Sequence, residues 1–201
     1  MKFGVENRQQ ANLFLSDFGL TAVASDVVGT DLYQTQNGCK IYLFDCNDSR
    51  LAPAIEAGST LREVIWGVDQ PQDLQDFAHR LADEPDFECS ENHVQCQDPN
   101  GLRIVFQPSI THALEAAKTE GINQFGRVQR INAASPVYTK AEPVDIGHVV
   151  FFTPDLEKTQ TFYIEKLGFH LSDAYRNRGA FLRCRGEGFH HDLFLLCVPH
   201  K

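Results

Sequence analysis

Residues 146–169, IGHVVFFTPDLEKTQTFYIEKLGF, contain the pattern that decides the fold. His148 opens an apolar stretch, His148–Phe152, which has the β-branched and aromatic composition of a strand. An amphipathic helix is expected near Asp155–Lys166, because apolar residues recur there at helical spacing. Gly168 follows directly, as a residue that ends a helix in the left-handed conformation. The segment therefore predicts a strand followed by a helix.

Further strands are expected on the C-terminal side of this helix, at Ala180–Cys184 and Asp192–Val198. Two earlier segments, residues 3–46 and 61–107, have the same order of elements. Their strands begin at Phe3–Val5 and Val64–Val68, and their helices at about Arg8–Asp17 and Pro71–Ala82.

The first and third segments also match residue by residue. Residues 13–20, LFLSDFGL, align with residues 162–169, FYIEKLGF, at a constant offset of 149 (168 − 19). Recurrence at a fixed offset is typical of a duplicated structural unit, although two unrelated amphipathic helices can also look alike. We therefore predict three copies of one strand–helix–strand unit.

The chain is expected to divide at a polar connection. Residues 1–108 would form a first domain from two copies of the unit, and residues 144–201 would hold the third copy. The intervening residues 109–143 begin with a probable helix at Ala113–Glu120 and end in a proline-containing polar stretch, as interdomain linkers often do.

Composition limits the classes of function. The net charge of −9 argues against nucleic-acid binding, which needs a clustered positive surface. No apolar run is long enough to span a bilayer, and residues 1–10 lack the apolar core of a signal peptide, so we expect a cytoplasmic protein without a membrane partner. The six cysteines form no metal-binding spacing and are interpreted as buried free thiols.

The motifs resemble those of the vicinal oxygen chelate superfamily, which includes glyoxalase I, bleomycin-resistance proteins and extradiol ring-cleaving dioxygenases. The resemblance rests on GHVVF at 147–151, LGF at 167–169 and HHDLF at 190–194, and it is weaker at DPNG, residues 98–101. The pattern is most similar to the two-domain extradiol dioxygenases. The resemblance implies an α+β fold of repeated βαβββ modules, with two modules in the first domain and one in an incomplete second domain.

The resemblance also implies a site. In this family two histidines and one glutamate hold Fe(II) and leave positions open for a diol and O₂. The first ligand histidine corresponds to His148, and the acid–base histidine outside the metal shell corresponds to His191. His190 would point the other way on the strand. An ordinary edge histidine that donates to a backbone carbonyl would fit His148 or His191 as well.

The repeat predicts where the other ligands would lie. The position equivalent to His148 in the second copy is Glu63 (148 − 85), and the second iron histidine is expected near position 212 (148 + 64), after Lys201. The carboxylate position after the turn at Gly101 holds Val105. His148 is then the only family ligand in the sequence, and one imidazole does not hold iron well. We expect a metal-free first domain and a chain that binds iron poorly or not at all and is inactive on its own.

The sequence therefore predicts a truncated copy or a fragment of an extradiol-type dioxygenase of aromatic-compound degradation. Its partners would be a catechol-like small molecule, O₂ and, across an exposed apolar sheet edge, another copy of the chain. A metal-free small-molecule binding module and a glyoxalase-like lyase are the alternatives. No residues for binding an organic cofactor are predicted.

Overall fold

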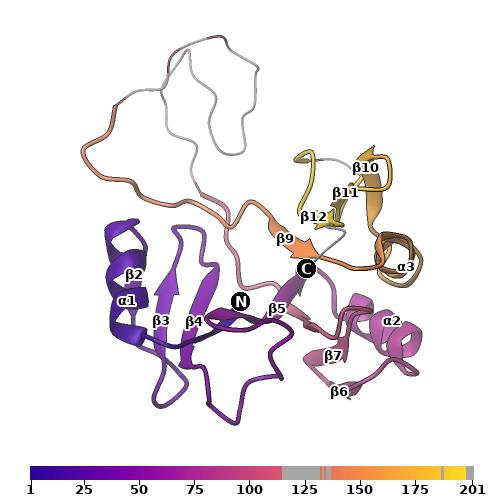
Figure 1. Ribbon diagram of the computed structural model, residues 1–201, viewed down its shortest axis with the longest axis horizontal. Helices are drawn as coiled ribbons and strands as arrows, with labels where there is room; N and C mark the ends of the chain where they lie inside the picture. Colours follow the sequence, from indigo (N-terminus) through magenta and orange to yellow (C-terminus); the bar gives the residue numbers. More distant parts are fainter. Residues whose placement is uncertain (115–131, 133, 135–136, 187, 198–201) are drawn as a thin grey trace.

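The computed structural model describes residues 1–114, 132, 134, 137–186 and 188–197. It contains two β-sheets with helices packed on their outer faces (Figure 1). The first module consists of β1 (Lys2–Val5), α1 (Arg8–Asp17), β2 (Thr21–Val23), β3 (Asp31–Gln34) and β4 (Lys40–Asp45). The second consists of β5 (Thr60–Val68), α2 (Pro71–Leu81), β6 (Glu88–Ser90), β7 (His93–Gln97) and β8 (Arg103–Pro108).

The third module has the same order of elements. It consists of β9 (Val149–Phe152), α3 (Leu156–Thr161) continued by a π-helical turn (Phe162–Lys166), β10 (His170–Tyr175), β11 (Gly179–Arg183) and β12 (Leu193–Leu196). The predicted α+β class is confirmed, and α1 has the predicted bounds. The predicted strand beginning at His148 begins one residue later, so that His148 lies directly before β9.

The first two modules share one eight-stranded sheet. Its order is β2-β3-β4-β1-β5-β8-β7-β6, and the modules join where β1 pairs antiparallel with β5. Within each module the first strand pairs parallel with the last, as in β5 with β8. The third module repeats this arrangement in a four-stranded sheet of order β10-β11-β12-β9. Among the described residues β9 is therefore an edge strand.

A π-helical turn explains why the offset between the first and third modules increases by one residue along the helix. The residues that cap the starts of the first and third helices are Asn7 and Asp155, which are 148 apart (155 − 7). The glycines that follow the helices, Gly19 and Gly168, are 149 apart and both have positive φ. The extra residue lies in the π-helical turn, since such a turn holds one more residue than an α-helical one. The sequence alignment covered only residues 162–169, without the start of the helix, and so could not detect the change of offset.

The core of the molecule lies between the second and third modules. Apolar side chains of α2 and β8, among them Leu81 and Ile104, belong to the same buried cluster as Tyr163 and Leu182 of the third module. Trp66 of β5 packs edge-on against Phe169, with 5.4 Å between ring centroids. Removal of this apolar surface from water is the main force that fixes the third module on the second.

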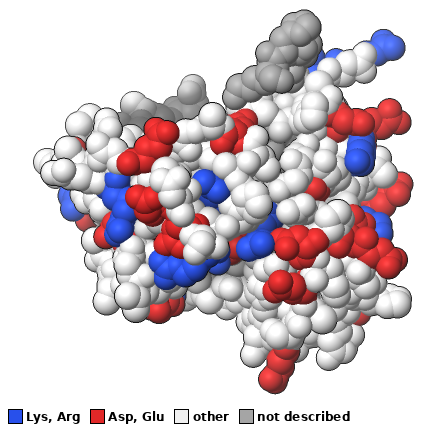
Figure 2. Space-filling model, turned by 60° about the horizontal axis from the view of Figure 1, so that its bottom comes forward, with Lys and Arg blue, Asp and Glu red and all other residues white. Residues whose placement is uncertain are grey.

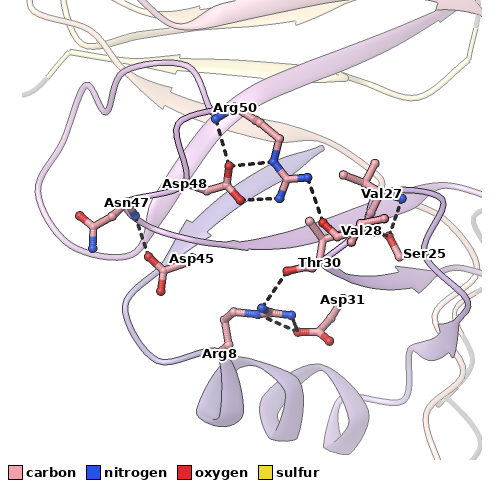
Figure 3. Close-up of polar contacts among 11 residues, drawn as sticks. Arg8, Ser25, Val27, Val28, Thr30, Asp31, Asp45, Asn47, Asp48 and Arg50 are labelled. Atoms are coloured by element: carbon pink, nitrogen blue, oxygen red, sulfur yellow. Dashed lines mark hydrogen bonds and ion pairs between the residues drawn. The ribbon is translucent and has the colours of Figure 1, made fainter.

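Two arginines, Arg8 and Arg50, form ion pairs and hydrogen bonds that join neighbouring loops of the first module (Figure 3). Arg50 pairs with Asp48 and also donates from Nη1 to the Val28 carbonyl at 2.9 Å. Arg8, in the first turn of α1, pairs with Asp31 at 2.7 Å. Together the two side chains connect the loop before β3, the loop after β4 and the start of α1.

The segment between the second and third modules begins and ends beside the same turn of the first sheet, at Asn37. The Asn37 carbonyl accepts the His112 amide at 2.9 Å, and the Asn37 amide donates to the Val144 carbonyl at 3.0 Å. The helix predicted at Ala113–Glu120 is not present at residues 113 and 114, and its remaining residues lie outside the described part of the chain. The cysteines are free as predicted, but only Cys96 is fully buried, whereas Cys89 and Cys184 are exposed.

Acidic and basic side chains are interleaved on the face of the molecule shown in Figure 2. No helix among the described residues is long and apolar enough to cross a membrane.

Candidate functional site

His148 lies at the point where the chain enters the second sheet. Its side chain is exposed, and the residue after it is the first of β9. The Val149 amide donates to the Asp192 carbonyl at 3.0 Å, which extends the parallel pairing of β9 with β12. The residues that precede the two strands, His148 and His191, are thereby brought to the same end of the sheet.

The two histidines are in contact. The ring centroids of His148 and His191 are 4.6 Å apart and the ring planes are inclined by 46°. Both side chains line a hollow of about 450 Å³, together with Asp145, Phe189 and His190. The two histidines selected from the sequence are thus 43 residues apart in the chain (191 − 148) and adjacent in space.

Asp192 fixes the backbone on which this contact depends. Its amide donates to the Leu182 carbonyl at 2.9 Å, and its carbonyl accepts from Val149. Its carboxylate accepts the Cys184 amide at 2.8 Å and so closes the loop between β11 and β12. One residue therefore connects β9, β11 and β12 immediately beside the two histidines.

His190 does not lie as the sequence predicted. A continuous strand would have turned His190 and His191 to opposite faces, but residues 188–191 are not part of a strand, since β12 begins at Leu193. The Nδ1 atoms of His190 and His191 are 3.2 Å apart, within hydrogen-bond distance. His190 is therefore a neighbour of His191 within the same hollow.

Phe181 of β11 forms the wall behind both rings. Its ring lies edge-on to His190 at 5.3 Å and to His191 at 4.9 Å, measured between centroids. Phe181 in turn stacks on Phe194 of β12 at 4.2 Å with nearly parallel planes. Sequence reasoning missed this aromatic wall, although the alternation of Phe181 and Phe194 on paired strands was a usable signal.

The surroundings favour the neutral form of His191. Burial lowers the pKa of its imidazole, and the neighbouring imidazoles of His148 and His190 lower this pKa further. Asp192 acts in the opposite direction and raises it. A neutral imidazole is the form that can accept a proton.

In the second and third modules the last strand carries no metal ligand at the position that corresponds to the family's carboxylate. Val105 of β8 pairs with Ile65, and the equivalent residue in the third module, opposite Val150, is Phe194 of β12. Neither side chain can coordinate a metal. Within the described part of the chain no group of three or more His, Cys, Asp or Glu side chains is arranged to hold a metal ion.

Glu63 occupies in the second module the position of His148 in the third. The residues that cap the starts of α2 and α3 are 85 apart (155 − 70), and 148 − 85 is 63. The side chain of Glu63 is almost completely buried, and its Oε1 lies 2.6 Å from Nζ of Lys2. An ion pair with the neighbouring strand β1 thus stands where the third module presents an imidazole.

A larger cavity of about 840 Å³ is lined by residues of the first sheet and of the third module. Its lining includes Lys40, Tyr42, Glu63 and Gln107 of the first two modules, and its far end reaches His148. Among the other histidines, His79 and His170 are exposed, whereas His93 is half-buried and lines this cavity. His200 lies outside the described residues.

Comparisons with known proteins show similarity in sequence and fold. Residues 145–196 match the family model of the Glyoxalase/Bleomycin resistance protein/Dioxygenase superfamily. Metapyrocatechase 2 of Cupriavidus necator is 27% identical over 191 residues, which are 92% of this chain and 56% of that protein. The chain thus spans little more than half the length of this curated relative.

Two solved structures share the fold. A halotolerant catechol dioxygenase superposes with a TM-score of 0.66 at 18% identity, over 98% of this chain and 63% of that one. The Mn(II)-bound glyoxalase of Novosphingobium aromaticivorans superposes with a TM-score of 0.67 at 19% identity, over 98% of this chain and 60% of that one. Residues 145–196 are thus similar to the Glyoxalase/Bleomycin resistance protein/Dioxygenase superfamily, and the chain shares its fold with a catechol dioxygenase and a glyoxalase.

Proposed function

We propose that the chain carries part of the site of an extradiol-type ring-cleaving dioxygenase. The observation that supports this proposal is the contact of His148 with His191 in a hollow at the head of β9 and β12. In the proposed site His148 is a metal ligand and His191 is the acid–base group, and the substrate is a catechol-like diol. The distant similarity to Metapyrocatechase 2 supports the same assignment.

Iron needs more ligands than the described residues supply. Fe(II) in a site of this class activates a diol and O₂ together. The equivalents of the carboxylate position in the second and third modules are Val105 and Phe194, and His148 is the single described residue at a family ligand position. The described residues therefore do not fit a complete iron site, and we expect weak iron binding by this chain.

The residues that are present can still act on a bound diol. The lowered pKa of His191 keeps its imidazole neutral near pH 7, so that it can take a proton from a diol hydroxyl group. The Phe181 ring packs edge-on against the imidazole of His191, and the hydrogen bond from the Cys184 amide to the Asp192 carboxylate holds the backbone next to His191. The proposed role of His191 is therefore proton uptake from the diol and its later return.

Titration with a nitro-substituted catechol tests this role, because the absorbance of the probe reports its ionisation. We expect the wild-type chain to ionise the bound probe at a pH where the free probe stays protonated. The variant His191→Ala should bind the probe without ionising it, and His170→Ala, at an exposed position of β10, should behave as the wild type. Equal ionisation by wild type and His191→Ala would contradict the proposal.

The metal role of His148 needs a separate measurement. In an anaerobic Fe(II) titration we expect one weak site, which is lost in His148→Ala and kept in His170→Ala. Tight stoichiometric iron that survives the His148→Ala change would contradict the proposed ligand.

A metal-free binding module is the second candidate. The 840 Å³ cavity favours it, since this cavity is lined by both polar and apolar side chains and is larger than the hollow at the histidines. If the module binds its ligand there, filling the cavity with Gln107→Trp should abolish probe binding, and His191→Ala should leave it unchanged. The dioxygenase proposal predicts instead that Gln107→Trp still binds the probe and that His191→Ala loses only the ionisation of the bound probe.

The remaining expectations stay proposals. We propose that residues 1–108 act as a metal-free structural domain and that residues 144–201 belong to the domain that carries the chemistry. Cytoplasmic location, O₂ as co-substrate and assembly into a homo-oligomer are proposed on the sequence arguments given above.

A further inference from the structure

We propose that His190 is a positioning residue for His191: Nδ1 of His190 accepts a hydrogen bond from the Nδ1–H of His191 and thereby reserves Nε2 of His191 for proton exchange. The observation that carries this proposal is the 3.2 Å distance between the two Nδ1 atoms. The use of His191 as acid and base rests on the proposed function. The hydrogen bond and the tautomer that it selects do not.

The distance constrains the protons on the two rings. A neutral imidazole carries one N–H, on either Nδ1 or Nε2. Two bare Nδ1 atoms at 3.2 Å would place their lone pairs against each other, and two Nδ1–H groups would place two hydrogens there. One ring of the pair must therefore donate and the other must accept.

The surroundings of the two rings favour His191 as the donor. His190 is exposed, so its Nε2–H can be satisfied by water, whereas His191 is half-buried between Phe181 and His148. When His191 takes up a proton at Nε2 it carries two N–H groups, and its Nδ1–H can then only donate. A neutral His190 accepts in both states, so the hydrogen bond need not be remade during proton transfer.

Phe181 keeps the two rings in place for this contact. Both imidazoles stand at 66° to its ring, and the Phe181 ring is itself held by the stack on Phe194. A base that is oriented by a further hydrogen-bonding group is a recurring arrangement in catalytic sites, because the partner fixes both the tautomer and the ring orientation. Here an imidazole would take the place that a carboxylate or carbonyl often holds.

The tautomers can be read directly by two-bond ¹H–¹⁵N correlation NMR of the full chain with ¹⁵N-labelled histidine, at a pH where the imidazoles are neutral. In the wild type we expect the His191 signals of an Nδ1–H tautomer. The variant His190→Ala should shift His191 to the Nε2–H form. His190→Asn should restore the Nδ1–H form, because the amide oxygen lies the same number of bonds from the backbone as Nδ1.

The control is His79→Ala, an exposed position on α2, which should leave the His191 signals unchanged. The backbone amide signals of β12 show whether each variant keeps its fold. An Nε2–H tautomer of His191 in the wild type would overturn the proposal, and so would a His190→Ala variant that is folded and keeps the Nδ1–H form. Neither metal nor diol is present in this NMR measurement. Its result therefore does not depend on whether the catechol titration supports the proposed function.

Discussion

Tyr163 and Asp98 come from different modules and meet inside the core. The Tyr163 hydroxyl is completely buried and donates to Oδ2 of Asp98 at 3.2 Å. Asp98 also accepts the amides of Asn100 and Leu102, so its carboxylate closes the turn before β8. Burial raises the pKa of Asp98 above its usual value, while these hydrogen bonds act to lower it.

This pair predicts a pH-dependent effect of Tyr163→Phe. A carboxyl with a raised pKa binds more protons in the folded state, so the free energy of unfolding falls as the pH rises from the ordinary value through the raised one. The variant removes a hydrogen bond that lowers the pKa of Asp98 and so widens this window. We expect a loss of about 2 kcal/mol at pH 7 and a smaller loss near pH 4, measured by urea unfolding.

The matched control for this change is Tyr138→Phe, because Tyr138 is largely exposed. It should be neutral at both pH values. A loss from Tyr163→Phe that is the same at both pH values would show that Asp98 does not titrate as described.

At the scale of single residues the sequence selected two histidines that lie in contact, His148 and His191, and misplaced their neighbour His190. His148 and His191 were found because a family motif marks them and because the repeat places them on paired strands. The position of His190 was wrong because a continuous strand was assumed, while the chain forms a loop up to Leu193. The partner of Glu63 could not be predicted, since Lys2 reaches it only through the pairing of β1 with β5.

At the scale of elements, the contact of β11 with β12 leaves no room at Gly179. A Cβ built there would lie 2.7 Å from the Phe194 ring and 2.8 Å from the Leu195 carbonyl oxygen. Phe194 in turn supports Phe181 and, through it, His191. Glycine at position 179 therefore allows the close packing of Phe194 on which the position of Phe181 beside His191 depends.

Gly179→Ala is accordingly expected to destabilise the chain by about 1–3 kcal/mol, because the added methyl group overpacks the strand pair. It should also shift the NMR signals of the His191 ring. The control Gly186→Ala adds the same methyl group where nothing lies within 4 Å, and it should change neither quantity. Equal stability of the two variants would contradict the proposed close packing.

The buried ion pair at the junction of β1 with β5 leads us to expect different stability losses when a buried and an exposed ion pair are removed. Glu63→Gln should cost about 2–3 kcal/mol, since it leaves the Lys2 ammonium without its partner at a largely buried position. Arg185→Gln, which breaks the exposed pair with Asp69, should cost no more than about 0.5 kcal/mol. Thermal unfolding of both variants measures the contrast, and similar losses would refute it.

Most elements were predictable because each module has a clear local pattern. The helices were found from apolar spacing and from the residues that end them, and the strands from β-branched and aromatic runs. The π-helical turn in residues 162–166 was not predictable, since it depends on the packing of Phe162 and Tyr163 against the second module. Packing between modules depends on contacts that no local pattern contains.

At the scale of the whole molecule, one apolar core serves the second and third modules. Leu81 at the end of α2 is fully buried in the cluster that also holds Leu182 and Leu195 of the second sheet. A shared core couples the stability of the two sheets, because unfolding of either sheet would expose the apolar side chains of the other to water.

We therefore expect a single unfolding transition for the chain and a loss of about 2–5 kcal/mol for Leu81→Ala. Hydrogen exchange should show equal losses of protection in β8 and β11, although Leu81 belongs to neither strand. The exposed α1 residue Leu13 provides a control, since Leu13→Ala should leave both strands unchanged. Loss of protection in β8 alone would show that the two sheets unfold independently.

The ion pair of Glu63 with Lys2 has a consequence for the history of the chain. When a module is copied, the second copy no longer has to keep a metal ligand, and its former ligand position is free to change. In the second module that position now joins two strands through opposite charges instead of presenting an imidazole. Equivalent positions of two modules thus differ in use, since one joins two strands through an ion pair and the other presents the imidazole that we propose as a metal ligand.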